Sequence, residues 1–339
     1  MKIKTYAGKN YSNGLGEPND ILALKETFKE VALSWIAEQS TMLKPTSINR
    51  YTFLLERHII PQIGGLAIQQ INNERIKEFI DDMSKSGRID NEGGLSNSTI
   101  NDMLILIKSI LSYAETKYNI IINIGKFRVT HKQQAKNRFY STADINALIT
   151  TAWERYNLNN SDLRCLGVLL CIYTGIRISE LCALRWEDIN LKRSVLFINS
   201  SLQRIKKENY DKKTTIVLGT PKTEKSVRVI PIKSIILEKL YAIQPLYTKN
   251  DFLLSGKADK AIEPRNMQYY FKQIQIDAGI EPLCFHSLRH TFASTCIQSG
   301  MDIKTLSEIL GHSSVNITLS YYVHSSMEQK LKQIEAIEY

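Results

Sequence analysis

The chain has 339 residues, of which 43% are hydrophobic and 23% are charged. This composition is typical of globular proteins, excludes wholesale disorder and fits two domains of roughly 100–200 residues each. No apolar run approaches the roughly 20 residues of a membrane span, and no apolar segment follows the basic N-terminal residues as in a secretory signal, so we expect a cytoplasmic protein. Lysine and arginine number 44 against 34 acidic residues, an excess that favours a polyanionic partner such as nucleic acid.

The five cysteines give little support to a disulfide framework or a cysteine zinc site. Their number is odd and no Cys-x-x-Cys pair occurs. We therefore expect buried, reduced thiols.

Helical periodicity dominates the first third of the chain. Residues 1–20 are rich in glycine and asparagine and predict a flexible lead-in. Residues 21–124 predict a bundle of about four helices without a convincing strand, because their apolar residues follow the spacing of amphipathic helices. The first expected helix starts near Asp20. The second follows a cap at Thr46 or Ser47 and ends before Pro61. The third starts at Asn73, and the fourth starts at Thr99 after a cap at Asn97 or Ser98.

A basic segment separates this bundle from the rest of the chain. Residues 125–138 contain five lysines or arginines, one histidine and no acid. A solvated linker is the simpler interpretation. A strap along a phosphate backbone, between two DNA-binding domains, is favoured because so long an acid-free run falls at the domain boundary.

Residues 139–326 predict a second domain that is mostly helical with one small antiparallel sheet. A cap at Ser141 or Thr142 starts its first helix, and Gly279, Gly300 and Gly311 each follow a helix, where a left-handed residue is favoured. The expected helices are 143–156, 163–173, 179–186, 235–247, 265–278, 287–298 and 303–310, the expected strands are 195–199, 214–219 and 227–232, and a tail helix is expected within 327–339. The predicted fold class is therefore mainly α with a small antiparallel β-sheet, a helical bundle followed by an α+β domain.

Four segments of the second domain carry side chains suited to phosphate chemistry. Each alone has an ordinary structural explanation, such as a surface ion pair or a polar helix face. Together, and in this order, they fit phosphoryl transfer without a metal. They are 174–181 with Arg177, 221–225 with Lys222, 286–290 with His286 and Arg289, and 310–324 with His312 and Tyr322.

Each of these residue types suits one task in that reaction. Arg177 and Arg289 could clamp the phosphate, whose negative charge increases in the transition state. A tyrosine can act as nucleophile, because its hydroxyl ionises more easily than that of serine. Lys222 can protonate the leaving 5′-oxygen, and His286 and His312 can donate hydrogen bonds to the phosphate or manage the tyrosine proton.

Neighbouring residues are assigned structural roles. His290 lies about 100° round the helix from Arg289 and is expected to pack inward. Glu180 and Asp188 are expected to hold the fold or to orient Arg177.

At these segments the sequence resembles the tyrosine recombinases, or phage integrases, over roughly residues 25–325. TGIRISELCALRWEDI resembles the first arginine box of that family, and PKTEKSVRVIPI resembles the hairpin that carries its lysine. HSLRHTFAS and LGHSSVNITLSYYVH resemble its second box. The resemblance implies an active site of Arg177, Lys222, His286, Arg289 and His312 with a tyrosine nucleophile. It also implies a helical, SAM-like core-binding domain in front, so that the two domains form a clamp around DNA.

Two assignments have neighbouring rivals. Tyr321 and Tyr322 are adjacent, and Tyr322 is preferred because only it forms the Tyr-x-His pattern of the family, through His324. Lys222 is preferred over Lys225 because it stands in the Pro-Lys-Thr pattern.

The resemblance implies a site-specific DNA recombinase that acts through a covalent 3′-phosphotyrosine intermediate and integrates or excises a mobile element. No cofactor, metal or ATP is expected. The expected partners are double-stranded DNA attachment sites, further copies of the chain in a tetramer on DNA with exchange of the C-terminal tail, and an excisionase or a host DNA-bending protein. No membrane partner is expected.

Two other functions would share features of this sequence. A catalytically inactive DNA-binding regulator would share the charge and the bundle, and a type IB topoisomerase-like enzyme would share the chemistry but act as a monomer. A zinc hydrolase is disfavoured, because His286 and His290 have the spacing of His-Glu-x-x-His but Ser287 replaces the glutamate.

Overall fold

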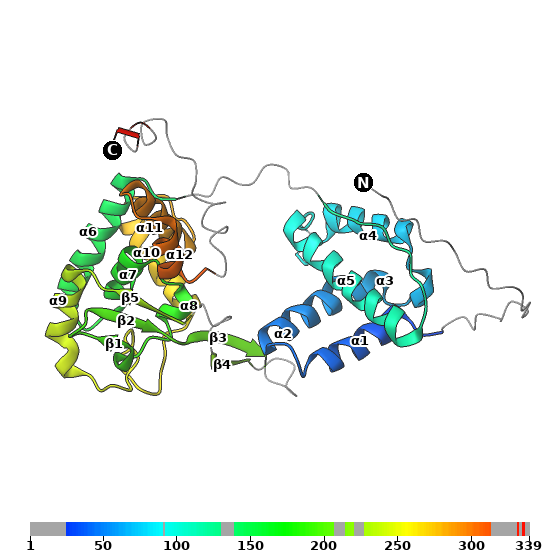
Figure 1. Cartoon of the computed structure of the whole chain (residues 1–339), viewed down its shortest axis with the longest axis horizontal. Coiled ribbons are helices and arrows are strands. Elements are labelled where there is room, and N and C mark those ends of the chain that lie inside the picture. Colours follow the sequence, from blue (N-terminus) through cyan, green and yellow to red (C-terminus); the bar gives the residue numbers. More distant parts are fainter. Residues whose placement is uncertain are drawn as a thin grey trace, which may run out of the picture. The chain divides into compact units, whose positions relative to one another are not determined.

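The computed structural model describes residues 25–90, 92–129, 139–206, 214–219 and 227–312, together with Leu331 and residues 334–335. The chain forms two compact units, Met1–Lys132 and Gln133–Tyr339, each of which has its own core (Figure 1). Within the described residues, no helix is long and apolar enough to cross a membrane.

The described part of the N-terminal unit is a helical bundle, as predicted. Its core is formed by fully buried side chains such as Phe28, Phe79 and Met103. α1 packs against α2, α3 and α5, and α4 packs against α3 and α5. The helices are α1 (Phe28–Gln39), α2 (Pro45–Leu54), α3 (Ile60–Ile63), α4 (Asn73–Ser86) and α5 (Asn97–Tyr118).

α1 begins later than predicted because a capping box fixes its first turn. The Thr27 hydroxyl accepts a hydrogen bond from the Glu30 N–H at 3.3 Å, and the Thr27 N–H donates to the Glu30 carboxylate at 2.8 Å. This reciprocal pair satisfies two N–H groups that would otherwise lack partners. The helix therefore starts at Phe28 rather than near Asp20.

The helix predicted to end before Pro61 does so, because α2 ends at Leu54, but its predicted caps are wrong. α2 starts at Pro45, so Thr46 and Ser47 lie inside its first turn. After α2 the chain makes a π-helical turn, Leu55–Ile59, and continues into α3 with Pro61 in the first turn. Pro61 has no N–H and so donates no backbone hydrogen bond where the π-helical turn joins α3.

The start of the basic segment lies on the N-terminal unit. The Asn101 side chain of α5 donates to the Val129 carbonyl and accepts from the Val129 N–H, both at 3.0 Å. Phe127 and Val129 pack against the core, whereas Lys126 and Arg128 between them are exposed. Residues 130–138 lie outside the described residues.

The C-terminal unit is built around the buried helix α7. α6, α8, α9, α10 and α11 all contact it (Figure 1), and nine of its eleven residues are buried. This explains the almost uninterrupted apolar run in its sequence. The helices are α6 (Thr142–Leu158), α7 (Arg164–Thr174), α8 (Ile178–Leu181), α9 (Ser234–Ile243), α10 (Pro264–Asp277), α11 (His286–Gln298) and α12 (Ile303–Leu310).

Most of these boundaries agree with the sequence prediction to within a few residues. Ser141 caps α6 by accepting from the Asp144 N–H at 3.1 Å, and the glycines at 279, 300 and 311 all have positive φ. The helix expected at 179–186 is shorter, because α8 ends at Leu181 and a separate 3₁₀ turn follows at Trp186–Asp188. The predicted tail helix lies almost entirely outside the described residues.

The described strands form two small antiparallel sheets instead of one. One sheet has the order β1-β2-β5, and β3 pairs with β4 in the other. The prediction missed β3, because its polar residues Gln203 and Arg204 interrupt the apolar pattern that marks a buried strand. The strands are β1 (Ile189–Asn190), β2 (Val195–Ile198), β3 (Ser201–Lys206), β4 (Thr214–Gly219) and β5 (Arg228–Pro231).

The cysteines are free, and four of the five are buried. Cys284 is exposed, so the expectation of buried thiols was wrong at that position.

Candidate active site

A glycine turn sets the position of Arg177. α7 ends at Thr174, and Gly175 follows with φ +63°, the left-handed conformation that favours glycine. A Cβ at this position would also lie 2.5 Å from the ring of Phe292. The chain then passes through buried Ile176, and Arg177 directly precedes α8.

Both the backbone and the guanidinium of Arg177 are fixed by neighbouring groups. Its N–H donates to Glu180 Oε2 at 2.9 Å and its Nη1 donates to Glu180 Oε1 at 2.7 Å. Its Nη2 donates to the Gly311 carbonyl at 3.2 Å, which connects α8 to the end of α12. The Arg177 side chain is one-third exposed, so part of it faces solvent.

Glu180 is buried between two guanidinium groups. Besides Arg177, it accepts from Arg228 Nη2 at 2.8 Å and Nη1 at 3.1 Å. Burial alone would raise the pKa of the Glu180 carboxyl, but the hydrogen bonds and charge of Arg228 and the charge of Arg177 together lower it below its ordinary value. The carboxylate is therefore ionised at neutral pH.

Asp188 has a different environment. Its carboxylate accepts from the Asn199 side chain at 2.7 Å and from the Arg185 N–H at 2.9 Å. These contacts hold the connection between α8 and β1, whereas Glu180 contacts Arg177 directly.

Arg289 connects the ends of two helices. It lies on α11 with only 3% of its surface exposed. Its Nη1 donates to the Gly175 carbonyl at 2.9 Å, and its Nη2 donates to the Leu310 carbonyl at 2.7 Å. The guanidinium therefore lies beside both the turn that carries Arg177 and the turn that precedes His312.

Three arginines bind three successive carbonyls at the end of α12. Ile309 accepts from Arg228 Nε at 2.6 Å, Leu310 accepts from Arg289, and Gly311 accepts from Arg177. The last carbonyls of a helix have no intrahelical donor and carry the negative end of its dipole. The end of α12 thus gathers guanidinium groups from α8, β5 and α11 in one place.

The two predicted histidines flank this cluster. His286 is the first residue of α11, and its ring lies edge-on to that of His290 with centroids 4.7 Å apart. His312 directly follows Gly311 and is half-buried. His290 is partly buried and its ring contacts that of His286, and its expected inward-facing role stays a prediction.

Both histidines are uncharged at neutral pH in the free protein. Burial, followed by the charges of His290, Arg289 and Arg177, lowers the pKa of His286 to about 4. Burial, followed by the charges of Arg289 and Arg177, also lowers the pKa of His312 to about 4. His286 is nevertheless exposed at the surface, so solvent weakens the effect of burial on its pKa.

We expect the protein to lose stability when acidified. An ordinary histidine has a pKa of about 6.5, so between pH 6.5 and 4 the unfolded chain binds protons at His286 and His312 that the folded chain excludes. The free energy of unfolding therefore decreases as the pH is lowered through this window. Above pH 6.5 these two residues no longer make it depend on pH. After allowance for solvent screening, we expect a loss of about 1–2 kcal/mol between pH 7 and pH 5.

Urea denaturation at several pH values measures this loss. The H286Q/H312Q double variant should lose less stability than the wild type over the same pH range. An equal loss in both proteins would contradict the assignment of the acid sensitivity to these two rings.

The structure brings together four of the six predicted site residues: Arg177, His286, Arg289 and His312. Lys222 and Tyr322 lie outside the described residues, as do their rivals Lys225 and Tyr321. Among the described residues, no group of three or more histidine, cysteine, aspartate or glutamate side chains is arranged to hold a metal ion.

Arg228 is the component of the cluster that the sequence analysis did not single out. The sequence does mark this residue, because Arg228 stands among apolar residues in the predicted strand 227–232. Such a charge at a core position of a strand calls for a buried partner.

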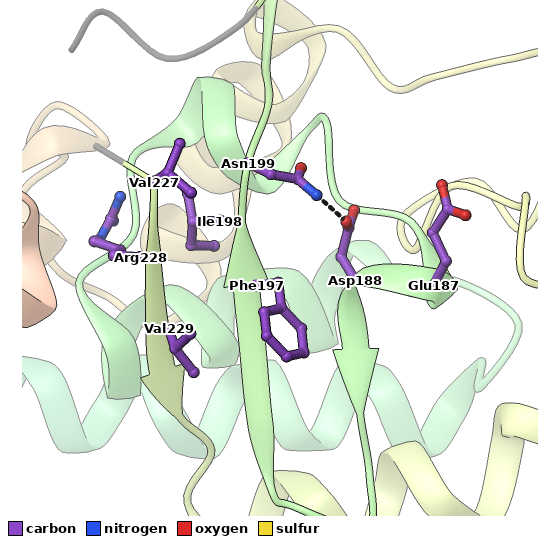
Figure 2. Close-up of a pocket in the computed structure, with 8 residues that line it drawn as sticks. All are labelled: Glu187, Asp188, Phe197, Ile198, Asn199, Val227, Arg228 and Val229. Carbon is purple, nitrogen blue, oxygen red and sulfur yellow. Dashed lines mark hydrogen bonds between the residues drawn. The ribbon is translucent and has the colours of Figure 1, made fainter. Parts of the chain in front are cut away.

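A shallow groove of about 460 Å³ lies on the sheet β1-β2-β5. Figure 2 shows Phe197 and Val229 on its strands and the hydrogen bond from Asn199 to Asp188 at its edge. The four described site residues do not line it. The candidate active site is therefore the end of α12 and not this groove.

Known proteins resemble the chain along most of its length. A tyrosine recombinase XerC-like protein of Caldanaerobacter subterraneus is 24% identical in an alignment 354 positions long, which covers 97% of this chain and 87% of the relative. The ICEBs1 integrase of Bacillus subtilis is 24% identical over 299 residues, covering 83% of this chain and 74% of the relative.

Solved structures share the fold. The Tn1549 transposon integrase in complex with a circular intermediate DNA has a TM-score of 0.70 at 20% identity, covering 92% of this chain and 100% of that one. A lambda integrase tetramer bound to a Holliday junction has a TM-score of 0.59 at 15% identity, covering 88% of this chain and 78% of that one.

Two family profiles match in the order that the sequence predicted. An N-terminal SAM-like domain of phage integrases matches residues 27–84. The phage integrase family itself matches residues 138–329, which include all six predicted site residues. The chain therefore belongs to the phage integrase family of tyrosine recombinases.

Proposed function

We propose that this protein is the integrase of a mobile element, which cleaves and rejoins DNA at attachment sites through a covalent 3′-phosphotyrosine intermediate. The observation that carries the proposal is the gathering of Arg177, Arg289 and His312 at the end of α12, with His286 on the same helix as Arg289. Fixed guanidinium groups suit a phosphodiester whose negative charge grows during reaction.

In the proposed reaction, the Tyr322 oxygen attacks the scissile phosphorus and displaces the 5′-oxygen of the next nucleotide. Arg177 and Arg289 neutralise the non-bridging oxygens, and His286 and His312 donate hydrogen bonds to them. Lys222 gives a proton to the leaving 5′-oxygen, which is more basic than a phenolate. The phosphotyrosine bond conserves the energy of the broken bond, so a 5′-hydroxyl of the partner strand can reverse the step without ATP.

Double-stranded DNA is the proposed partner of both units. The net charge of +10 favours binding to phosphates. Exposed Lys126 and Arg128 alternate with the anchored Phe127 and Val129, which suits a strap that follows a DNA backbone. The described relatives include integrases bound to DNA and a tetramer on a Holliday junction, and we propose DNA binding and self-association for this chain as well.

Further partners remain predictions. An excisionase or a host DNA-bending protein would set the direction of the reaction. The cytoplasmic location also stays a prediction, in keeping with an enzyme that acts on DNA.

A duplex that traps the covalent intermediate tests the proposed function. The protein is incubated with a nicked attachment-site duplex, whose short 3′ fragment diffuses away after cleavage, in the presence of EDTA. We expect a protein–DNA adduct that survives SDS and disappears on protease treatment. DNA binding without an adduct would instead indicate an inactive regulator, and plasmid relaxation without strand exchange would indicate a topoisomerase.

Removal of the C-terminal tail tests the proposed tail exchange. We expect a chain that ends at Ser326 to bind a single half-site within about threefold of the full-length affinity but to form far less tetramer on a full site, because the tail would contact a neighbouring protomer. Native gel shifts on half-sites and full sites measure both quantities. Equal assembly by both chains would show that the tail packs elsewhere.

A further inference from the structure

Arg228 occupies a core position of β5. Side chains alternate along a strand, so Arg228 and Ile230 lie on one face while Val227 and Val229 lie on the other. Both members of the first pair are buried, and Val227 and Val229 are exposed. Arg228 also pairs across the sheet with Ile198, another buried residue.

The contacts of Arg228 compensate for this burial. A buried charge is costly unless it is paired and hydrogen-bonded. Its Nη1 and Nη2 donate to Glu180, and its Nε donates to the Ile309 carbonyl. The side chain passes so close to Gly311 that a Cβ there would lie 2.9 Å from Arg228 Cδ. The path from β5 to Glu180 is therefore closely fitted.

The charges around Glu180 make Arg228 more than a structural contact. Arg177, Glu180 and Arg228 together carry a net charge of +1. Without Arg228, the buried carboxylate would face Arg177 alone, and that pair would be neutral. Arg177 would then be held against Glu180 with little charge left for a phosphate.

We propose that Arg228 is a positioning residue, which binds and neutralises Glu180 so that Arg177 keeps its positive charge for the scissile phosphate. The inference rests on the proposed strand-cleavage reaction. Arg228 acts through Glu180 and does not itself touch DNA. Its loss should therefore lower the rate of cleavage and leave DNA affinity almost unchanged.

Single-turnover cleavage of the trapping duplex, at saturating protein, tests the proposal. We expect R228M to cleave about a hundredfold more slowly than wild type while its dissociation constant for the duplex changes by less than about threefold. R228K keeps the charge and should retain most of the rate. R193M removes an exposed arginine of the same unit and serves as the matched control, with an unchanged rate.

A double variant separates electrostatic from structural effects. The E180Q/R228M variant removes both buried charges, and the positive charge of Arg177 is then no longer paired with a carboxylate. We therefore expect the cleavage rate of this variant to return to within about tenfold of wild type. A purely structural role predicts that the double variant is at least as slow as R228M. Thermal melting of each variant identifies any that does not fold. The double variant distinguishes the two roles even if R228M is unfolded, because residues 180 and 228 are both uncharged in it and no buried charge lacks a partner.

Two results would overturn the inference. One is an R228M rate equal to that of wild type, and the other is a folded double variant that remains more than about tenfold below wild type. Either result leaves the proposed function intact as long as the wild type forms its adduct. Failure of the wild type to form an adduct would instead reject the proposed function.

Discussion

Replacing Tyr322 with phenylalanine is expected to abolish the covalent protein–DNA adduct while leaving DNA binding unchanged. The substitution removes only the hydroxyl oxygen, which is the attacking atom in the proposed reaction. SDS gel electrophoresis of the protein with a labelled trapping duplex measures the adduct, and a gel shift measures binding.

The adjacent tyrosine provides the matched control. Y321F should form the adduct at a rate close to that of wild type. If Y322F still forms it and Y321F does not, the nucleophile is Tyr321, and the Tyr-x-His pattern is a poor guide to its position in this chain.

Replacing Arg289 with alanine should slow cleavage by roughly 10³-fold, because a preorganised donor to the developing phosphate charge is lost. The same change removes the hydrogen bonds to the Gly175 and Leu310 carbonyls, which leaves two buried acceptors without this partner. We therefore also expect a lower melting temperature. Single-turnover cleavage and a thermal melt of the same preparation give the two effects separately.

One variant of Arg289 and one of Arg265 serve as comparisons for R289A. R289K keeps the charge but loses the two-armed geometry, and we expect it to remain well below wild type. R265A removes an arginine of α10 that contacts the neighbouring Tyr269 side chain and should cleave normally. Cleavage by folded R289A at a wild-type rate would exclude Arg289 from the active site.

The sequence predicted the candidate site residues better than the backbone groups that hold them in place. Arg177, His286, Arg289 and His312 were recognisable because each stands in a short segment whose residue types and order carry a chemical meaning. The carbonyls that hold these arginines could not be foreseen, since every residue has one and only the fold brings Gly175, Leu310 and Gly311 together.

Local signals likewise predicted some element boundaries and missed others. Ser141 and Gly311 act within one turn of the helix that they begin or end, so their effects can be read from neighbouring residues. The π-helical turn Leu55–Ile59 and α3 were not predicted, because a proline such as Pro61 usually marks the end of helical structure. β3 was missed because it depends on pairing with β4, whose paired residues lie between 8 and 18 positions further along the chain, more than on its own apolar pattern.

The hydrogen bonds at the end of α12 link three side chains of one proposed site, in which Arg177 and Arg289 bind the phosphate and Arg228 acts through Glu180. Arg228, Arg289 and Arg177 are bound to consecutive peptide groups, so a small rotation or shift of this single turn displaces all of them in concert. Misalignment of one guanidinium alone would require the turn to be distorted. The site is thus built to be assembled or dismantled as a unit, which would let a single local movement decide whether a protomer can cut DNA.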